Sequence, residues 1–146
     1  MGMIDISDKP VISRLAVASG VINLKKDTIK KIMSGNIKKG DPIQAAEIAA
    51  MQAVKKTPEF LAYCHPIPIE NVGVDFKFED DKITVEVTVK AMAKTGVEME
   101  CLQGITTALN TIWDLVKYLE KDEKGQYLDT SITNVKVLKK IKSEKL

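Results

Sequence analysis

The chain has 146 residues, of which 45% are hydrophobic and 29% charged, and this balance excludes a disordered or low-complexity chain. The length predicts one domain over residues 1–146. Basic residues number 22 and acidic residues 20, with the lysines scattered, so no nucleic-acid partner is expected. No apolar run could span a bilayer and no secretion signal is recognisable, which predicts a cytoplasmic protein with no membrane partner.

The first part of the chain predicts a strand followed by two helices. Residues 11–24 are rich in Val, Ile and Ala, which indicates one long strand or two pieces bent at Gly20. Residues 25–33 have a helical pattern, and the small residues after them would end that helix. The sequence Gly-Asp-Pro at 40–42 supplies an N-cap aspartate and a proline suited to the first helical position. A second helix is therefore expected from there to about Lys56.

The middle of the chain predicts a loop and then a hairpin. Several prolines interrupt residues 57–70, so we expect a loop of extended pieces that another surface covers. Apolar and polar residues then alternate along 72–78 and 83–89, with an aspartate pair between the two runs. This alternation predicts two strands that cover a core on one side only.

A long helix is expected from near Gly96, and its two sides differ in character. The apolar side, at about 100° per residue, carries Leu102, Ile105, Leu109, Ile112, Val116 and Leu119. The opposite, polar stripe carries Glu100, Gln103, Thr107, Asn110, Asp114 and Lys117. With a last strand over 132–141, the element order predicts an α+β fold, a ferredoxin-like two-layer sandwich whose antiparallel sheet is covered by helices.

The single histidine, His65, lies beside Cys64 in the proline-flanked loop. A lone histidine is usually structural, but a loop stiffened by proline can also present a side chain for function. A zinc site at this pair would need further ligands from Cys101 or from the glutamates at 98 and 100. The two cysteines make no disulfide framework, and reduced thiols are expected.

Charged residues at three other places in the chain are candidates for function. Glu98 and Glu100 stand at a helix start, where they are either stabilised by the helix dipole or bind separate parts of a polar ligand. Asp114 and Lys117 share one helix face, as a surface ion pair or as acid-base partners. Lys39 stands just before a helix N-terminus, a combination that attracts anions.

Six motifs connect these groups to a known family. They are MIDIS at 3–7, KGD at 39–41, KKT at 55–57, CHPIPI at 64–69, KTGVEME at 94–100 and TIWDLVK at 111–117. In order and spacing they resemble the family of molybdenum cofactor biosynthesis protein C, the cyclic pyranopterin monophosphate synthases, from about Met3 to Lys140.

The resemblance implies a hexamer, a trimer of dimers, with the active site at a subunit interface. It implies conversion of 3′,8-cyclo-7,8-dihydro-GTP to cyclic pyranopterin monophosphate with release of pyrophosphate. No cofactor is required for this reaction, although Mg²⁺ can accompany the triphosphate.

By motif match, the resemblance also assigns residue roles. The catalytic residues are Asp114, Lys117 and Lys39. The substrate-binding residues are Tyr63, Cys64, His65, Glu98, Met99, Glu100, Arg14, Lys9 and Asp5, and no residue is assigned to a metal. Arg14 is expected to reach a neighbouring subunit's site.

The chemistry adds one expectation: Lys39 and Lys117 should lie close enough to lower each other's pKa. The chain departs from the family at Glu47, where arginine is common, at Trp113, where tyrosine is usual, and in its tail. The tail reads KKIKSEKL without the family's Gly-Gly-Lys-Ser-Gly stretch, which leaves Lys140 or Lys142 as its basic group. The alternatives are another enzyme acting on nucleotides or pterins, and a non-catalytic oligomeric scaffold.

Overall fold

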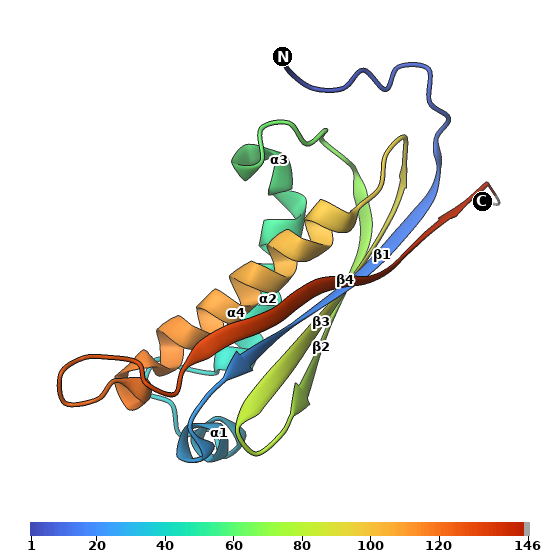
Figure 1. The fold of residues 1–146 in the computed structure, drawn as a ribbon. Helices are drawn as coiled ribbons and strands as arrows, with labels where there is room; N and C mark the ends of the chain where they lie inside the picture. Colours follow the sequence, from blue (N-terminus) through green and yellow to red (C-terminus); the bar gives the residue numbers. More distant parts are fainter. Residues whose placement is uncertain (145–146) are drawn as a thin grey trace.

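The computed structural model describes residues 1–144, which form one α+β sandwich (Figure 1). Its elements in chain order are β1 (Ile12–Asn23), α1 (Lys26–Met33), α2 (Pro42–Lys55), α3 (Thr57–Phe60), β2 (Ile69–Phe78), β3 (Lys82–Ala93), α4 (Glu98–Glu120) and β4 (Ser131–Ser143). The last two residues of the lysine-rich tail, 145–146, lie outside the described residues. No helix of residues 1–144 is long and apolar enough to cross a membrane.

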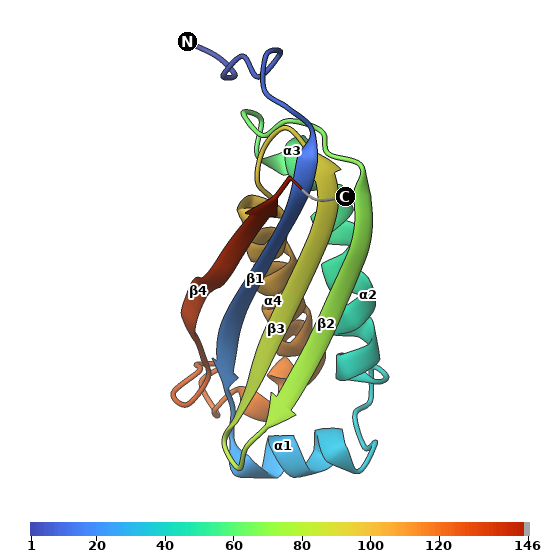
Figure 2. The ribbon, with the colours of Figure 1, turned by 90° about the vertical axis from the view of Figure 1, so that its right-hand side faces the viewer.

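The four strands form one antiparallel sheet in the order β2-β3-β1-β4. Figure 2 shows that α2 and α4 lie against one face of this sheet, whereas the face toward the viewer is uncovered. Two strand-helix units interleaved in this order are the ferredoxin-like arrangement. The predicted fold class is therefore confirmed.

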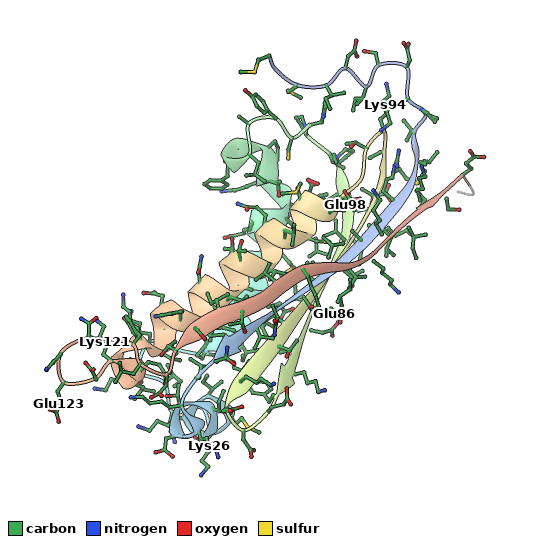
Figure 3. The ribbon with its side chains drawn as sticks, viewed as in Figure 1. Lys26, Glu86, Lys94, Glu98, Lys121 and Glu123 are labelled. Carbon is green, nitrogen blue, oxygen red and sulfur yellow. The ribbon has the colours of Figure 1, made fainter. Side chains whose placement is uncertain are left out.

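Strand β3 shows why one face of the sheet is covered. Its alternate residues Ile83, Val85, Val87 and Val89 are fully buried on the helix side. The residues between them are polar and stay partly exposed, among them Glu86, which Figure 3 labels. The predicted one-sided hairpin is confirmed, since a period of two places all apolar side chains of a strand on one face.

Strand β1 is one continuous strand and is not two pieces bent at Gly20. It pairs with β3 without interruption, and only its β4 side shows register shifts, on both sides of Ser19. Gly20 is required for packing, because a Cβ there would lie 2.7 Å from Ile105 Cγ2 and 2.8 Å from Leu109 Cδ1. The glycine thus lets α4 lie close against β1.

Helix α2 begins as the sequence predicts. The Asp41 carboxylate accepts hydrogen bonds from the backbone N–H groups of Ile43 (2.9 Å) and Gln44 (3.3 Å). Close packing against α4 depends on Gly104 of that helix, because a Cβ there would lie 2.9 Å from Val54 Cγ2 of α2. The glycine thus lets the two long helices lie close together.

The expectation of a loop throughout residues 57–70 is wrong at its start, where α3 forms. Proline lacks only the N–H that the first helical turn leaves unused, so Pro58 begins this helix instead of preventing it. The buried Thr57 hydroxyl donates to the carbonyls of Ala53 (3.1 Å) and Val54 (3.0 Å) at the end of α2. Residues 61–64 then form a turn, in which the Cys64 N–H donates to the Leu61 carbonyl at 2.9 Å, and residues 65–68, without helix or strand, lead into β2.

Candidate active site

Asp114, Lys117 and Lys39 form a cluster on the exposed face of α4, which we call the lysine–aspartate cluster. Asp114 Oδ1 lies 2.9 Å from Lys117 Nζ and 3.6 Å from Lys39 Nζ. The Lys39 ammonium also donates to the Asp114 backbone carbonyl at 3.2 Å. One carboxylate therefore lies between two ammonium groups that come from elements far apart in the sequence.

The cluster changes the acid strength of its members. The hydrogen bond from Lys117, helped by the charges of Lys117 and Lys39, lowers the pKa of Asp114 below its ordinary value. The same hydrogen bond raises the pKa of Lys117. The expectation of a lowered lysine pKa is thus wrong for Lys117, because the carboxylate between the two lysines outweighs their repulsion.

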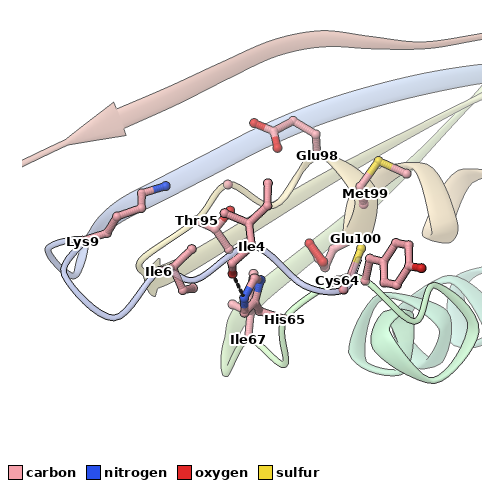
Figure 4. A pocket seen from close by; sticks show the side chains of 13 residues that line it. Ile4, Ile6, Lys9, Cys64, His65, Ile67, Thr95, Glu98, Met99 and Glu100 are labelled. Atoms are coloured by element: carbon pink, nitrogen blue, oxygen red, sulfur yellow. Dashed lines mark hydrogen bonds between the residues drawn. The ribbon is translucent and has the colours of Figure 1, made fainter.

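A cavity of about 410 Å³ lies at the other end of α4, and we call it the N-terminal pocket. Its walls come from residues 2–9, from the loop at 63–67 and from residues 95–100, as Figure 4 shows. Of the predicted binding residues it gathers Lys9, Tyr63, Cys64, His65, Glu98, Met99 and Glu100. Three segments distant in sequence therefore line one pocket.

His65 joins the loop to the first residues of the chain. Its Nε2 lies 2.8 Å from the carbonyl oxygen of Ile4 (Figure 4). Lys94 adds a second attachment by donating to the carbonyl of Ser7 at 3.1 Å. These two contacts hold residues 2–9 across the pocket, a covering that strand and helix patterns do not predict.

Asp5 forms a local turn outside the pocket, and Cys64 lines the pocket with a thiol whose pKa is raised. The Asp5 carboxylate accepts hydrogen bonds from the Ser7 N–H and hydroxyl, which lower the pKa of Asp5 and form a local turn. It is absent from the pocket wall, so the structure does not bring it together with the other predicted binding residues. Burial raises the pKa of the Cys64 thiol, and the charge of Glu100 acts in the same direction.

Glu98 and Glu100, at the start of α4, have carboxyl pKa values shifted in opposite directions. Burial disfavours the ionised form of Glu98, but a hydrogen bond from Lys140 (3.0 Å) and the nearby positive charges leave its pKa below the ordinary value. Glu100 is only 3% exposed, and burial raises its pKa to about 7. Within residues 1–144 no group bonds to its Oε2. A buried, unpartnered carboxyl oxygen beside a cavity is suited to bind a ligand.

The burial of Glu100 corrects the prediction of a continuous polar stripe. The stripe is exposed at Asn110 and Asp114, but the loop at 63–67 and the N-terminal residues close over its first turn. Arg14 is also buried, on the helix side of β1, where its Nε donates to the Ala93 carbonyl at 3.3 Å. Its positive charge acts on Glu98 of the same chain, and its reach into a neighbouring subunit stays a prediction.

No group of three or more His, Cys, Asp or Glu side chains among residues 1–144 is arranged to hold a metal ion. Cys101 points away from the pocket region toward β1, because its thiol donates to the Ala16 carbonyl. The ligand set considered for zinc is therefore not assembled within the described part of the chain.

The pocket and the cluster lie far apart within one chain. Glu98 and Asp114 are sixteen residues apart on α4, which corresponds to about 24 Å along the helix axis. Figure 3 shows this separation through the labels of Glu98 and Lys121 near opposite ends of α4. A nucleotide-sized molecule in the pocket therefore does not reach the cluster of the same chain.

The fold is ferredoxin-like, with a pocket at one end of α4 and the lysine–aspartate cluster toward the other. Residues 3–143 match the MoaC family, and the chain belongs to that family. This confirms the resemblance that the six sequence motifs indicate.

Several curated relatives match nearly the whole chain. The "probable cyclic pyranopterin monophosphate synthase" of Aeropyrum pernix is 54% identical over 136 residues, which cover 93% of each chain. That of Thermococcus kodakarensis is 51% identical over 142 residues, 97% of this chain and 91% of its own. A relative from Methanothermobacter thermautotrophicus is 50% identical over 97% of this chain and 89% of its own. It is named "probable cyclic pyranopterin monophosphate synthase accessory protein".

Proposed function

We propose that the chain converts 3′,8-cyclo-7,8-dihydro-GTP to cyclic pyranopterin monophosphate and pyrophosphate in active sites shared between subunits. Its family and its relatives of about 50% identity make it an enzyme of molybdenum cofactor biosynthesis, a cyclic pyranopterin monophosphate synthase. The substrate and the residue roles are the part that we propose.

The observation that supports a site shared between subunits is the distance between the N-terminal pocket and the lysine–aspartate cluster of one chain. Acid-base groups act on a substrate only from hydrogen-bond distance, and about 24 Å of helix lies between the pocket and Asp114. If both serve one reaction, the cluster of one subunit must face the pocket of another. Each subunit then contributes to two active sites, as closed symmetric assembly allows.

The N-terminal pocket would bind the purine-derived ring and the phosphates. Glu98 and Glu100 offer carboxyl oxygens for the ring N–H groups, and His65 lies beside them. Lys9 in the pocket wall and Lys140 beside Glu98 supply positive charge toward the triphosphate. Fixed cations stabilise the charge that develops as an oxygen of the former ribose attacks the α-phosphorus and pyrophosphate leaves.

The lysine–aspartate cluster would move protons during the ring rearrangement. Lys117 carries a proton at neutral pH, and it can donate this proton to a ring nitrogen or an oxygen once it leaves the hydrogen bond to Asp114 that raises its pKa. Asp114, once its hydrogen bond to Lys117 is released, can accept one. Lys39 places a second ammonium group beside the pair through its contacts to Asp114.

Exposed apolar side chains beside the pocket support assembly. Phe60 and Tyr63 are 68% and 67% exposed, and Met99 in the pocket wall is also exposed. Apolar groups gathered at a functional site are typical of surfaces that another subunit covers. We infer a homohexamer, a trimer of dimers, in which these residues are covered.

The reaction as proposed requires no redox cofactor. The elements of the substrate are redistributed between pterin and pyrophosphate, and Mg²⁺ enters only as a partner of the triphosphate. A phosphorylated substrate that does not cross membranes supports the cytoplasmic location that the sequence predicts.

A turnover assay tests this function. Purified protein is incubated anaerobically with 3′,8-cyclo-7,8-dihydro-GTP, and pterin product and pyrophosphate are measured, with the Asp114→Asn variant as the control. We expect both products in equal amounts from the parent and almost none from the variant. Binding without products would favour a scaffold or accessory role, and products from other nucleotides or pterins alone would favour a different enzyme.

A further inference from the structure

The turn that carries Lys39 is held against α4 by Tyr118, the residue that follows Lys117. Lys38 and Lys39 are the two central residues of a turn closed by a hydrogen bond from the Gly40 N–H to the Ile37 carbonyl, at 3.2 Å. The Lys38 N–H points out of this turn and donates to the Tyr118 hydroxyl at 3.0 Å. The Lys38 ammonium also lies 5.5 Å from the centre of the Tyr118 ring.

Few other contacts fix this part of the connection between α1 and α2. Ile37 is its one buried residue between positions 34 and 41, and Gly35 and Gly40 have positive φ angles of 76° and 119°. Lys39 itself is exposed and has a long, flexible side chain. The position of its ammonium beside Asp114 therefore depends on how the backbone of the turn is held.

We propose that Tyr118 is a positioning residue of the active site, which holds the Lys38 backbone so that Lys39 stays beside Asp114. The inference rests on the proposed function of the lysine–aspartate cluster, because it gives Tyr118 a role only through Lys39. Tyr118 binds no substrate atom in this account. A misplacement of about 1 Å in a catalytic group can reduce turnover by roughly 10²-fold, so one hydroxyl can be important for rate.

The first test follows the Lys39 side chain by NMR, which requires no turnover. Lysine side-chain signals are recorded for the parent and for Tyr118→Phe, and Lys39→Arg identifies the Lys39 signal. We expect Tyr118→Phe to move the Lys39 signal toward that of a solvent-exposed lysine, while Lys117 keeps its shift because its bond to Asp114 is intact. An unchanged Lys39 signal would overturn the proposal.

A matched control separates the hydroxyl from the ring. Lys38→Met removes the ammonium above the Tyr118 ring but keeps the backbone N–H that the hydroxyl accepts. We therefore expect the Lys39 signal to stay near its parental position in Lys38→Met. An equal shift in both variants would assign the effect to the ring contact and contradict the role of the hydroxyl.

The second test uses steady-state kinetics. We expect Tyr118→Phe to lower kcat by roughly ten-fold with little change in KM, because the N-terminal pocket of the facing subunit holds the substrate and the substitution disturbs only the acid-base geometry. A raised KM with an unchanged kcat would contradict the proposal, as would parental kinetics. If the parent does not turn over the substrate, the proposed function fails, whereas the NMR comparison still decides whether Tyr118 positions Lys39.

Discussion

At the scale of single residues, Asp114 places one carboxylate between the ammonium groups of two lysines. It hydrogen bonds to Lys117 and contacts Lys39 through both its side chain and its backbone oxygen. Because these groups are exposed, the arrangement contributes little to folding. In the proposed mechanism, the arrangement keeps a proton donor, Lys117, in contact with a proton acceptor, Asp114.

The first prediction separates a catalytic pair from a surface ion pair. Asp114→Asn and Lys117→Ala should each lower turnover by roughly 10² to 10⁴-fold, the contribution of general acid-base catalysis. Both variants should melt within a few degrees of the parent and still bind substrate, because the exposed pair supports neither the core nor the pocket. Turnover assays, melting curves and ligand titration check this. Near-normal turnover in both would contradict the catalytic role, and loss of folding would make the pair structural.

Glu100 gives a prediction with a definite sign. Its pKa of about 7 in the folded chain is above the ordinary 4.5, so the folded state binds this proton more tightly than the unfolded state. Its contribution therefore favours folding below about pH 4.5 and is lost as the pH rises through 7. Glu100→Gln, which stays neutral, should gain stability relative to the parent over that interval. The difference in melting temperature, measured at each pH, checks this.

Glu98→Gln is the matched control for that measurement. The pKa of Glu98 is lowered in the folded chain, so its contribution is present above the ordinary value of 4.5 and lost as the pH falls through the folded value. Its difference from the parent should stay flat from about pH 5 to 8 and shrink only at lower pH. A flat difference for Glu100→Gln would show that Glu100 is ionised when folded.

At the scale of elements, the sequence pattern predicts those helices and strands that are specified by residues close together in the chain. The alternation in β3 and the Asp41-Pro42 start of α2 specify their elements directly. The α3 helix is missed because a proline serves equally as a breaker and as a first helical residue. The burial of Glu100 depends on a loop some thirty-five residues earlier in the chain, so helix periodicity does not reveal it.

The packing of β1 against α4 yields the next prediction. Gly20→Ala should lower the free energy of unfolding by about 1 to 3 kcal/mol, the usual cost of overpacking, because its Cβ would lie 2.7 Å from Ile105 Cγ2. Gly73→Ala is the matched control in a strand, since its Cβ would meet only Thr88 Cβ at 3.8 Å. Chemical denaturation should show a loss for Gly20→Ala alone. An equal loss in both variants would contradict overpacking as the cause, because the lower entropy of the unfolded chain in a Gly→Ala variant stabilises the fold.

At the scale of the whole molecule, the proposed reaction uses groups at both ends of α4. In this proposal the carboxyls and cations at the pocket end bind the substrate, and the groups at the far end transfer protons. Motifs in the sequence identify the members of both groups. Their separation follows from the sixteen residues between Glu98 and Asp114 on α4, a helix that the sequence predicts.

Subunit complementation tests the shared site most directly. His65→Ala and Asp114→Asn chains are coexpressed with different tags, and oligomers that contain both are purified and assayed; light scattering must first show a multiple of 16.1 kDa. With random assembly about a quarter of the sites pair an intact pocket with an intact cluster, so mixed oligomers should regain about that share of parental activity. Oligomers of either variant alone should stay inactive. A mass of one chain, or mixed oligomers as inactive as either variant, would place pocket and cluster in one subunit and contradict the account.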